Sequence, residues 1–398
     1  MRNLRRRSPL NAVESAGVAA RISLWIATAA FVSSGCAARE VHLDGDPSDA
    51  GSTNSNSSPD AIAPGVSVVV EDQETAIRIA VDETRIYWQS ALPNSWAEAR
   101  GKPYARIRSC LKSDCRSTIT TYDSITFIWQ GPQTHNEYFA LAVGGDNVYW
   151  AQYEGDARLT IWTCPSAGCV GAPRAVVSHI GLASMAVDDT HVYWTSRDDT
   201  AILRLPLTGA GTPHAIAVNE PTPGQLVVGA THVYWIANAG QSSAAIKRAP
   251  KDGSEPAVTL AKEQNQASSL AIDEGFVYWA NSYLVGTISR CPLSGCSDAP
   301  TVLIADQNRP RALVVDGTSI FWMSLVGNLG PHMTWATVMR CPVNGCSSAT
   351  ETWAVQTFAP TGMAMTADQN HVYWVAQGKE EPMSTGFYPQ ATIYRRAK

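Results

Sequence analysis

The stretch HVYWTS, residues 191–196, holds no reactive side chain, yet close relatives of it recur along the chain. The other copies read RIYW, NVYW, HVYW, FVYW, SIFW and, once more, HVYW. Aligned on the tryptophan, the seven copies stand at Trp88, Trp150, Trp194, Trp235, Trp279, Trp322 and Trp374, and most neighbours lie 41 to 44 residues apart. Such a period is typical of repeat architectures. The chain is therefore expected to be one array of repeats.

Each copy lies in a frame of four short apolar runs. A first run such as SLAID (269–273) precedes a polar turn and the VYW run, and runs such as TISRCPL (287–293) and APTVLIA (299–305) follow. Four short strands in each unit are typical of a β-propeller blade. We predict an all-β fold, a seven-bladed β-propeller of four-stranded antiparallel blades over residues 65–398.

The Tyr-Trp pair predicts how the blades pack. Because side chains alternate along a strand, Tyr and Trp point to opposite faces of the blade. One is expected to pack on the previous blade and the other on the next. The chain ends in ATIYRRAK (391–398), which matches a third strand, so we predict that GVSVVVED (65–72) supplies the missing fourth strand and closes the last blade.

The frame VYW-x(n)-I-x-R-x-P-L-x-G resembles the YWTD-type propeller repeat of lipoprotein-receptor ectodomains and its bacterial relatives, over about residues 65–398. The fourth position of the motif is never Asp here, and we count seven units where the receptor form has six. The resemblance implies the architecture but not the receptor ligands. Residues 124–136 (SITFIWQGPQTHN) are either an insertion or a fragment of another strand.

Eight of the nine cysteines fall into four pairs of one spacing, C-x4-C. The pairs are Cys110 and Cys115, Cys164 and Cys169, Cys291 and Cys296, and Cys341 and Cys346. In an exported chain this spacing predicts four local disulfides. Each pair should flank the turn between strands three and four, where opposed Cα atoms lie ~4.5–5.5 Å apart. A zinc site would require the pairs to converge, which the repeat register forbids.

The N-terminus predicts export. A basic segment, MRNLRRRSPL, and Arg21 precede the apolar stretch 22–32, which has the length of a signal peptide core. The following Ser33-Ser34-Gly35-Cys36 resembles the lipobox of bacterial lipoproteins, which implies lipidation at Cys36; plain secretion by cleavage near Ala37 is the alternative. We expect a lipoprotein signal peptide over 1–36, a flexible polar linker over 37–64, and a lipid-anchored location in the bacterial cell envelope, at the outer membrane or in the periplasm, or secretion.

Charge and motifs exclude several functions. The net charge is −5, 16% of residues are charged, and no basic stripe follows residue 21, which argues against nucleic-acid binding. The sequence shows no P-loop, nucleophile elbow or zinc-protease motif. We expect no cofactor, no metal and a monomer.

Two repeated polar positions are interpreted as structural. His191, His232 and His371 each precede VYW. Asp82, Asp188, Asp273 and Asp316 end the first run and are expected to cap the turn that follows. A calcium ladder is the alternative for the aspartates.

The loops between strands two and three, and between blades, share one face of a propeller. Here they are rich in aromatic residues, a composition typical of recognition surfaces. The candidate ligand-binding residues are Trp96, Tyr104, Tyr153, Arg197, Asp199, Tyr283, Trp335 and Tyr388. Alternatively, the long loops fold their aromatic residues into small clusters of their own.

The first hypothesis is a non-catalytic, lipid-anchored cell-envelope binding or scaffold protein that recognises a protein or glycan. The alternative is a propeller enzyme, a lyase or hydrolase, that uses His135, His179 or His332 with Glu137 or Asp199 at the channel mouth. A structural envelope role without a small ligand is the third hypothesis.

Overall fold

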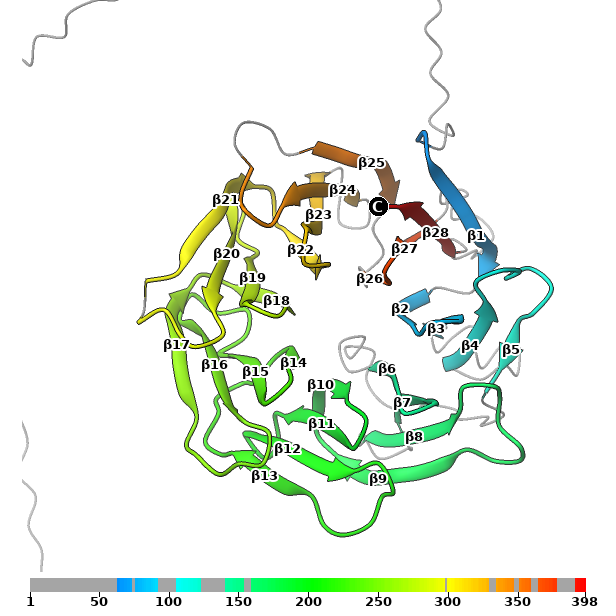
Figure 1. Ribbon diagram of the computed structural model, residues 1–398, viewed down its shortest axis with the longest axis horizontal. Coiled ribbons are helices and arrows are strands. Elements are labelled where there is room, and N and C mark those ends of the chain that lie inside the picture. Colours follow the sequence, from blue (N-terminus) through cyan, green and yellow to red (C-terminus); the bar gives the residue numbers. More distant parts are fainter. Residues whose placement is uncertain are drawn as a thin grey trace, which may run out of the picture. The chain divides into compact units, whose positions relative to one another are not determined.

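The computed structural model describes residues 63–73, 76–91, 105–122, 140–153, 159–297, 299–328, 334–346, 351–358, 364–377 and 391–398. They form seven four-stranded antiparallel blades, which Figure 1 shows stacked around a ring. The prediction of a seven-bladed β-propeller is confirmed. No helix in the described residues is long and apolar enough to cross a membrane.

The blades follow one another along the chain. Blade 1 is β2 (Ala76–Val81), β3 (Arg85–Ala91), β4 (Ala105–Leu111) and β5 (Thr120–Thr121), and blade 2 is β6 (Leu141–Gly144), β7 (Asn147–Tyr153), β8 (Leu159–Pro165) and β9 (Arg174–Ile180). Blade 3 is β10 (Leu182–Val187), β11 (His191–Ser196), β12 (Ala201–Pro206) and β13 (His214–Ala217), and blade 4 is β14 (Leu226–Val228), β15 (His232–Ala237), β16 (Ala244–Pro250) and β17 (Val258–Gln264). Blade 5 is β18 (Ala267–Ile272), β19 (Phe276–Asn281), β20 (Gly286–Pro292) and β21 (Thr301–Gln307). Blade 6 is β22 (Arg311–Val315), β23 (Ser319–Asn328), β24 (Thr334–Pro342) and β25 (Glu351–Phe358).

Blade 7 closes the ring with both ends of the domain. It contains β26 (Met365–Ala367), β27 (His371–Gln377), β28 (Ala391–Ala397) and β1 (Val66–Gln73). Strand β1 pairs antiparallel with β28, from Val66 opposite Arg396 to Gln73 opposite Ala391. The predicted closure by the N-terminal strand is therefore confirmed. It removes the open outer edge that β28 would otherwise present.

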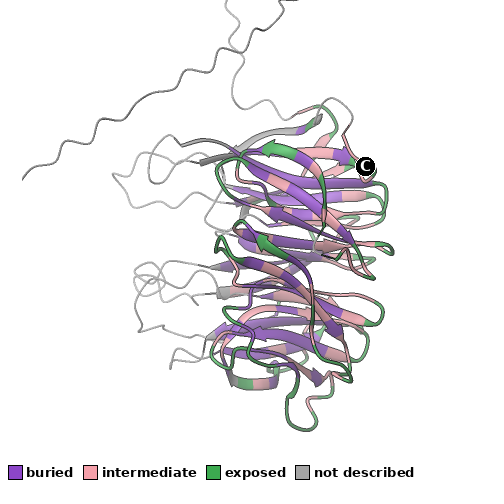
Figure 2. Ribbon diagram, turned by 90° about the vertical axis from the view of Figure 1, so that its left-hand side faces the viewer, coloured by how far each residue is buried: buried purple, intermediate pink, exposed green. Residues whose placement is uncertain are grey.

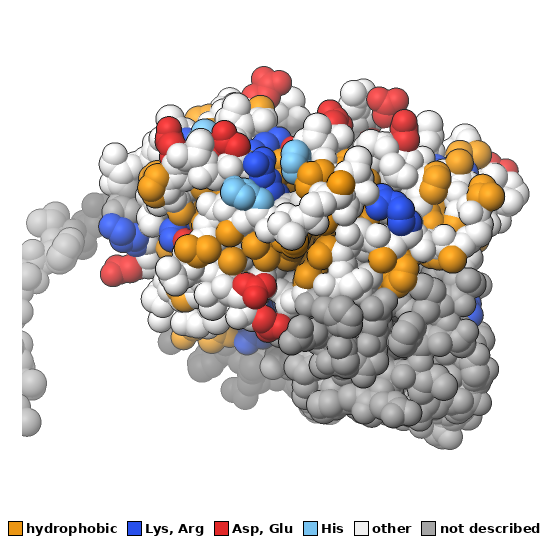
Figure 3. Space-filling model, turned by 90° about the horizontal axis from the view of Figure 1, so that it is seen from below, with side chains coloured by type: hydrophobic (Ala, Val, Ile, Leu, Met, Phe, Trp, Pro, Cys, Tyr) orange, Lys and Arg blue, Asp and Glu red, His pale blue; other side chains and the backbone are white. Residues whose placement is uncertain are grey.

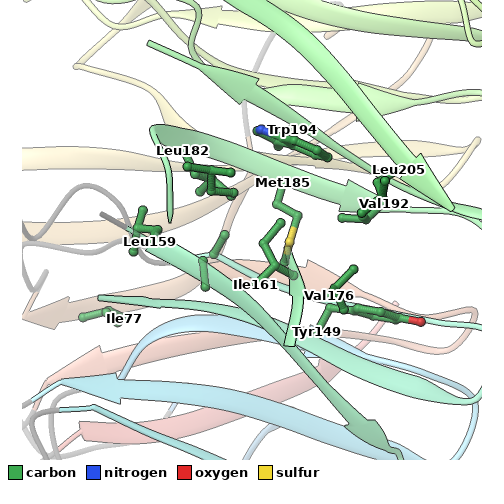
Figure 4. Close-up of a cluster of buried hydrophobic side chains, with 13 residues drawn as sticks. Ile77, Tyr149, Leu159, Ile161, Val176, Leu182, Met185, Val192, Trp194 and Leu205 are labelled. Carbon is green, nitrogen blue, oxygen red and sulfur yellow. The ribbon is translucent and has the colours of Figure 1, made fainter. Parts of the chain in front are cut away.

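The Tyr-Trp pairs fill the interfaces between blades as predicted. The seven buried clusters each contain the tyrosine of one blade, or Phe321 in blade 6, and the tryptophan of the next. Figure 4 shows one of them, in which Tyr149 of blade 2 and Trp194 of blade 3 enclose Ile161 and Met185. Both aromatic side chains are at most 1% exposed. Viewed edge-on in Figure 2, the buried residues run along the middle of the strands.

The four cysteine pairs are disulfides, with Cα–Cα distances of 4.7 to 5.6 Å. The prediction is corrected in one detail, because the two cysteines do not oppose each other across strands three and four. Cys164 lies in β8, but Cys169 lies in the loop, and β9 begins only at Arg174. Within this loop Gly168 donates its backbone N–H to the Pro165 carbonyl at 3.0 Å, which forms a β-turn. The disulfide therefore spans a turn and does not link two paired strands.

Candidate functional site

The two ends of the propeller differ, and we name them by what they carry. The turn face holds the turns between strands one and two and between strands three and four. The loop face holds the hairpins between strands two and three and the connections between blades. Its described hairpins are residues 197–200, 238–243 and 282–285, and its described connections include 218–225, 265–266 and 308–310.

The turn-face aspartates cap their turns, as predicted. Asp188 Oδ1 accepts the backbone N–H groups of Thr190 and His191, both at 2.9 Å, and Oδ2 accepts the Tyr193 hydroxyl at 2.9 Å. Asp82, Asp273 and Asp368 make the same three bonds in their blades. The tyrosine that packs between blades is thus also held at its hydroxyl, a bond that the sequence pattern did not predict. Among the described residues no group of His, Cys, Asp or Glu is arranged to hold a metal ion.

A lysine from the next blade contacts three of the turn-face aspartates, including Asp316, which caps its turn through the backbone N–H groups of Thr318 and Ser319. The residue after strand three donates its backbone N–H to the first turn of its own blade throughout the ring. Where it is lysine, its Nζ contacts the aspartate of the preceding blade: Lys112 with Asp368 at 2.5 Å, Lys251 with Asp188 at 2.7 Å, and Lys398 with Asp316 at 3.1 Å. Burial by itself would raise the pKa of the Asp188 and Asp368 carboxyls, but the lysines and the other donors outweigh it and hold both pKa values well below the usual range.

The arginine of the repeated I-x-R-x-P frame has a matching role. Arg290 donates to the Val343 carbonyl of the next blade at 2.7 Å, and Arg395 of blade 7 donates to the Lys112 carbonyl of blade 1 at 3.1 Å. At the junction of the last and first blades, Arg395 therefore reaches from blade 7 to blade 1, and the Lys112 side chain reaches from blade 1 to blade 7. The motif arginine joins neighbouring blades on the turn face.

The repeated histidines lie against the aromatic residues of the interfaces, in keeping with the structural interpretation. The ring of His191 lies 6.0 Å from that of Tyr193, and the ring of His232 lies 6.3 Å from that of Tyr234. In blade 5 the same position is Phe276, 6.1 Å from Tyr278. Burial lowers the pKa of these histidines, which keeps the neutral imidazole. Burial, and then the bond to its aspartate, raise the pKa of Tyr278 to about 12.

A second repeated polar position lies on the loop face. In blades 4, 5 and 6, a Gln or Glu oxygen fifteen residues before the tryptophan, at the end of strand four or just beyond it, accepts the indole N–H. The pairs are Glu220 with Trp235 at 3.0 Å, Gln264 with Trp279 at 2.8 Å, and Gln307 with Trp322 at 3.1 Å. The fifteen-residue spacing is visible in the sequence, but it was not among the repeated positions predicted from it.

In blade 4 this acceptor is a buried carboxylate with a lysine partner. The side chain of Glu220 is 3% exposed, and its Oε1 accepts from Lys247 Nζ at 2.6 Å. Lys247 lies opposite Trp235 on β16 and also 5.9 Å from its ring centre. In blade 5 the corresponding positions are the neutral Gln264 and Ser289. In these two blades the two positions are therefore both charged or both neutral.

Only part of the predicted ligand-binding set lies among the described side chains. Trp96, Tyr104 and Tyr388 lie outside the described residues, and of Tyr153 and Trp335 only the places in β7 and β24 are described.

The remaining three candidates belong to two different hairpins. Asp199 accepts a hydrogen bond from the Ser196 hydroxyl at 2.7 Å and thereby shapes its own hairpin with Arg197 in blade 3. Tyr283 is 46% exposed in the blade 5 hairpin. Blade 4 lies between them, so these three do not meet in one site.

Most residues of the enzyme alternative lie outside the described side chains. His135, Glu137 and His332 lie outside the described residues, as does the side chain of His179, and Asp199 is bonded to Ser196. Two of them share a sequence position with the indole acceptors. His135 and His179 stand fifteen residues before Trp150 and Trp194, the position of the indole acceptors in blades 4 to 6.

Comparisons with known proteins show the fold. No family model matches the chain, and no curated protein matches it. Virginiamycin B lyase from Staphylococcus aureus superposes with a TM-score of 0.53 at 11% identity, over 83% of this chain and 98% of that one. A puromycin-hydrolyzing peptidase of Mycobacterium tuberculosis superposes with a TM-score of 0.53 at 13% identity, over 82% of this chain and 52% of that one. At these identities the likeness shows a β-propeller and nothing about activity.

The chain is thus a β-propeller repeat protein with four disulfides. The closer relationship to YWTD-type repeats stays a prediction from the sequence. On the outer edge that Figure 3 shows, acidic and basic side chains are interspersed.

Proposed function

We propose that the protein is a non-catalytic binding or scaffold module of the cell envelope, anchored by lipid at Cys36, whose loop face recognises a protein or glycan. One observation carries the proposal: the loop face presents three adjacent exposed apolar side chains, Tyr283, Leu284 and Val285, which are 46%, 53% and 65% exposed. Contiguous exposed apolar surface marks interaction sites, whereas single exposed apolar residues are ordinary. The other strongly exposed apolar side chains of the described residues stand singly.

The path of the chain supports the same assignment of the two faces. Strand β1 starts at Val66 opposite Arg396, so the preceding segment enters the propeller at the turn face. The polar linker of 28 residues (37–64) would span about 30 Å as a flexible coil. A lipid at Cys36 would then hold the turn face toward the membrane and leave the loop face free for a partner.

The anchor is tested by metabolic labelling with a radioactive fatty acid. The full chain should take up the label and fractionate with membranes, and the Cys36→Ser variant should do neither. An unlabelled wild-type chain that is released in soluble form would contradict the anchor while leaving the loop-face proposal to its own test.

Recognition by the loop face is tested by replacing loop-face segments with Gly/Ser chains of equal length. Envelope extracts should yield partners with the full chain but not with a variant in which 92–104, 283–285 and 378–390 are all replaced. A matched control replaces the turn-face loop 252–255, which should leave capture unchanged. Equal capture by all three proteins would refute a loop-face function.

A further inference from the structure

The hairpin between β19 and β20 has a tip unlike its neighbours. Its exposed residues are Tyr283, Leu284 and Val285, whereas the corresponding hairpins of blades 3 and 4 read RDDT (197–200) and NAGQSS (238–243). An aromatic and two aliphatic side chains lose contact with water only if something covers them. Three exposed apolar side chains contribute nothing to the stability of the fold. Among the described parts of the loop face, this tip therefore points most clearly to a function outside folding.

The base of the hairpin is firmly braced. The buried Ser282 donates from its hydroxyl to the Pro310 carbonyl at 2.5 Å and from its backbone N–H to the Gln266 carbonyl at 3.1 Å. Asn281 donates its side-chain amide to Gln264 Oε1 at 3.2 Å. These bonds tie the hairpin to the connections on both sides of blade 5.

Gly286 shows how closely the base is packed. A Cβ atom at this position would lie 2.1 Å from the Asn281 carbonyl oxygen and 2.6 Å from Pro310 Cδ. Such distances exclude any other residue without movement of the backbone. A braced base with an apolar tip is a pre-organised contact element, and pre-organisation reduces the ordering cost of binding.

We propose that this hairpin tip is a docking element for a protein partner that offers an apolar cleft. The inference rests on the proposed binding function and names the element and the class of partner. A glycan surface is covered with hydroxyl groups, and neither Leu284 nor Val285 can exchange hydrogen bonds with them through its side chain. Aromatic and aliphatic anchors buried in a partner's pocket are, by contrast, the typical energetic centre of protein interfaces.

Topology argues against a membrane as the occupant. The chain enters the propeller at the opposite face, at Val66. A second copy is disfavoured because the described hairpins of blades 3 and 4 on the same face are polar.

The first experiment places a photo-crosslinking amino acid at position 284 of the full chain in its cell envelope, with position 241 of the blade 4 hairpin as the matched control. The proposal expects a discrete protein adduct from position 284. Adducts to lipid alone or to a second copy would overturn it. Protein adducts from 241 but not from 284 would overturn the docking element and leave the proposed function standing, and no adduct from either position would overturn both.

The second experiment measures the affinity of the crosslinked partner, once purified, for the full chain. Leu284→Asp should weaken binding by about tenfold or more, as loss of an interface anchor does, whereas Gln241→Asp should change it less than about twofold. Both residues are exposed, so both variants should unfold at the wild-type temperature. Unchanged affinity in Leu284→Asp would show mere proximity and overturn the proposal.

Discussion

The buried ion pair of blade 4 permits a double-mutant cycle that copies the neighbouring blade. Glu220→Gln and Lys247→Ser together give blade 4 the residues that blade 5 carries as Gln264 and Ser289. Each single substitution instead leaves one charged residue of the blade 4 pair without its partner. The cycle therefore tests whether the lysine is present because the carboxylate is buried.

The two single variants should differ in how much unfolding free energy they lose. Lys247→Ser leaves a carboxylate that is 3% exposed with the indole N–H of Trp235 as its remaining described donor, which should cost about 3–5 kcal/mol of unfolding free energy. Glu220→Gln keeps an acceptor for the indole, and Lys247, which is 20% exposed, can reach water, so the cost should be about 1 kcal/mol. The double variant should lie within about 1 kcal/mol of the wild type, because neutral replacements of a buried pair are often tolerated.

The assay is equilibrium unfolding in guanidinium, followed by tryptophan fluorescence and by circular dichroism, whose coincidence checks two-state behaviour. Lys251→Ser is the control. It removes a similar ion pair, but Asp188 keeps the Tyr193 hydroxyl and two backbone donors, so the loss should be smaller. A coupling energy below about 0.5 kcal/mol in the cycle, or a Lys247→Ser variant as stable as Glu220→Gln, would refute the reasoning.

Three further predictions concern the turn face. The pKa of Asp368 is lower in the folded protein than the unfolded value of about 3.9, so its stabilisation is present above that pH and is lost as the pH falls through the folded pKa. In unfolding titrations the stability difference between wild type and Asp368→Asn should therefore shrink as the pH falls from about 5 to about 3. The pKa of His232 is also lowered, from about 6.5, so the unfolded chain takes up the proton first and acid destabilises the wild type. The His232→Phe variant, which copies Phe276, should therefore gain stability relative to the wild type as the pH falls from 7 to 5. A stability difference that does not change with pH would contradict this. Replacing Cys341 and Cys346 by Ala should cost about 2 kcal/mol on a chain-entropy estimate, and an unchanged denaturation midpoint would count against any stabilisation by the bridge.

The sequence predicted the interfaces between blades better than their polar contacts. Tyr149 and Trp194 could be assigned to opposite blade faces because side-chain alternation along a strand is a local property. The bond from Trp279 to Gln264 spans fifteen residues and repeats, so it was recoverable from spacing alone. The contact of Lys112 with Asp368 was not, because the two residues are 256 positions apart and meet only when the ring closes.

The candidate site was less predictable than the fold for the same physical reason. Tyr283 and Asp199 were selected as aromatic and charged residues of variable loops, a compositional argument that carries no information on distance. The structure places them in different blades and shows that Asp199 bonds within its own hairpin. The exposure of Leu284 and Val285 beside Tyr283 was not foreseen, because burial depends on what surrounds a loop.

The repeated pattern of apolar runs with paired aromatic residues was sufficient to predict a circular array of four-stranded blades, since such a pattern can hide both faces of each sheet only by stacking. The sequence also determined which cysteines pair, because their spacing is local. Which polar groups meet became visible only in the folded ring: Lys247 contacts Glu220, Arg395 contacts the first blade, and the tip at Leu284 is exposed. Those outcomes depend on side chains from different blades, whose separation is set by the closed ring and not by distance along the chain.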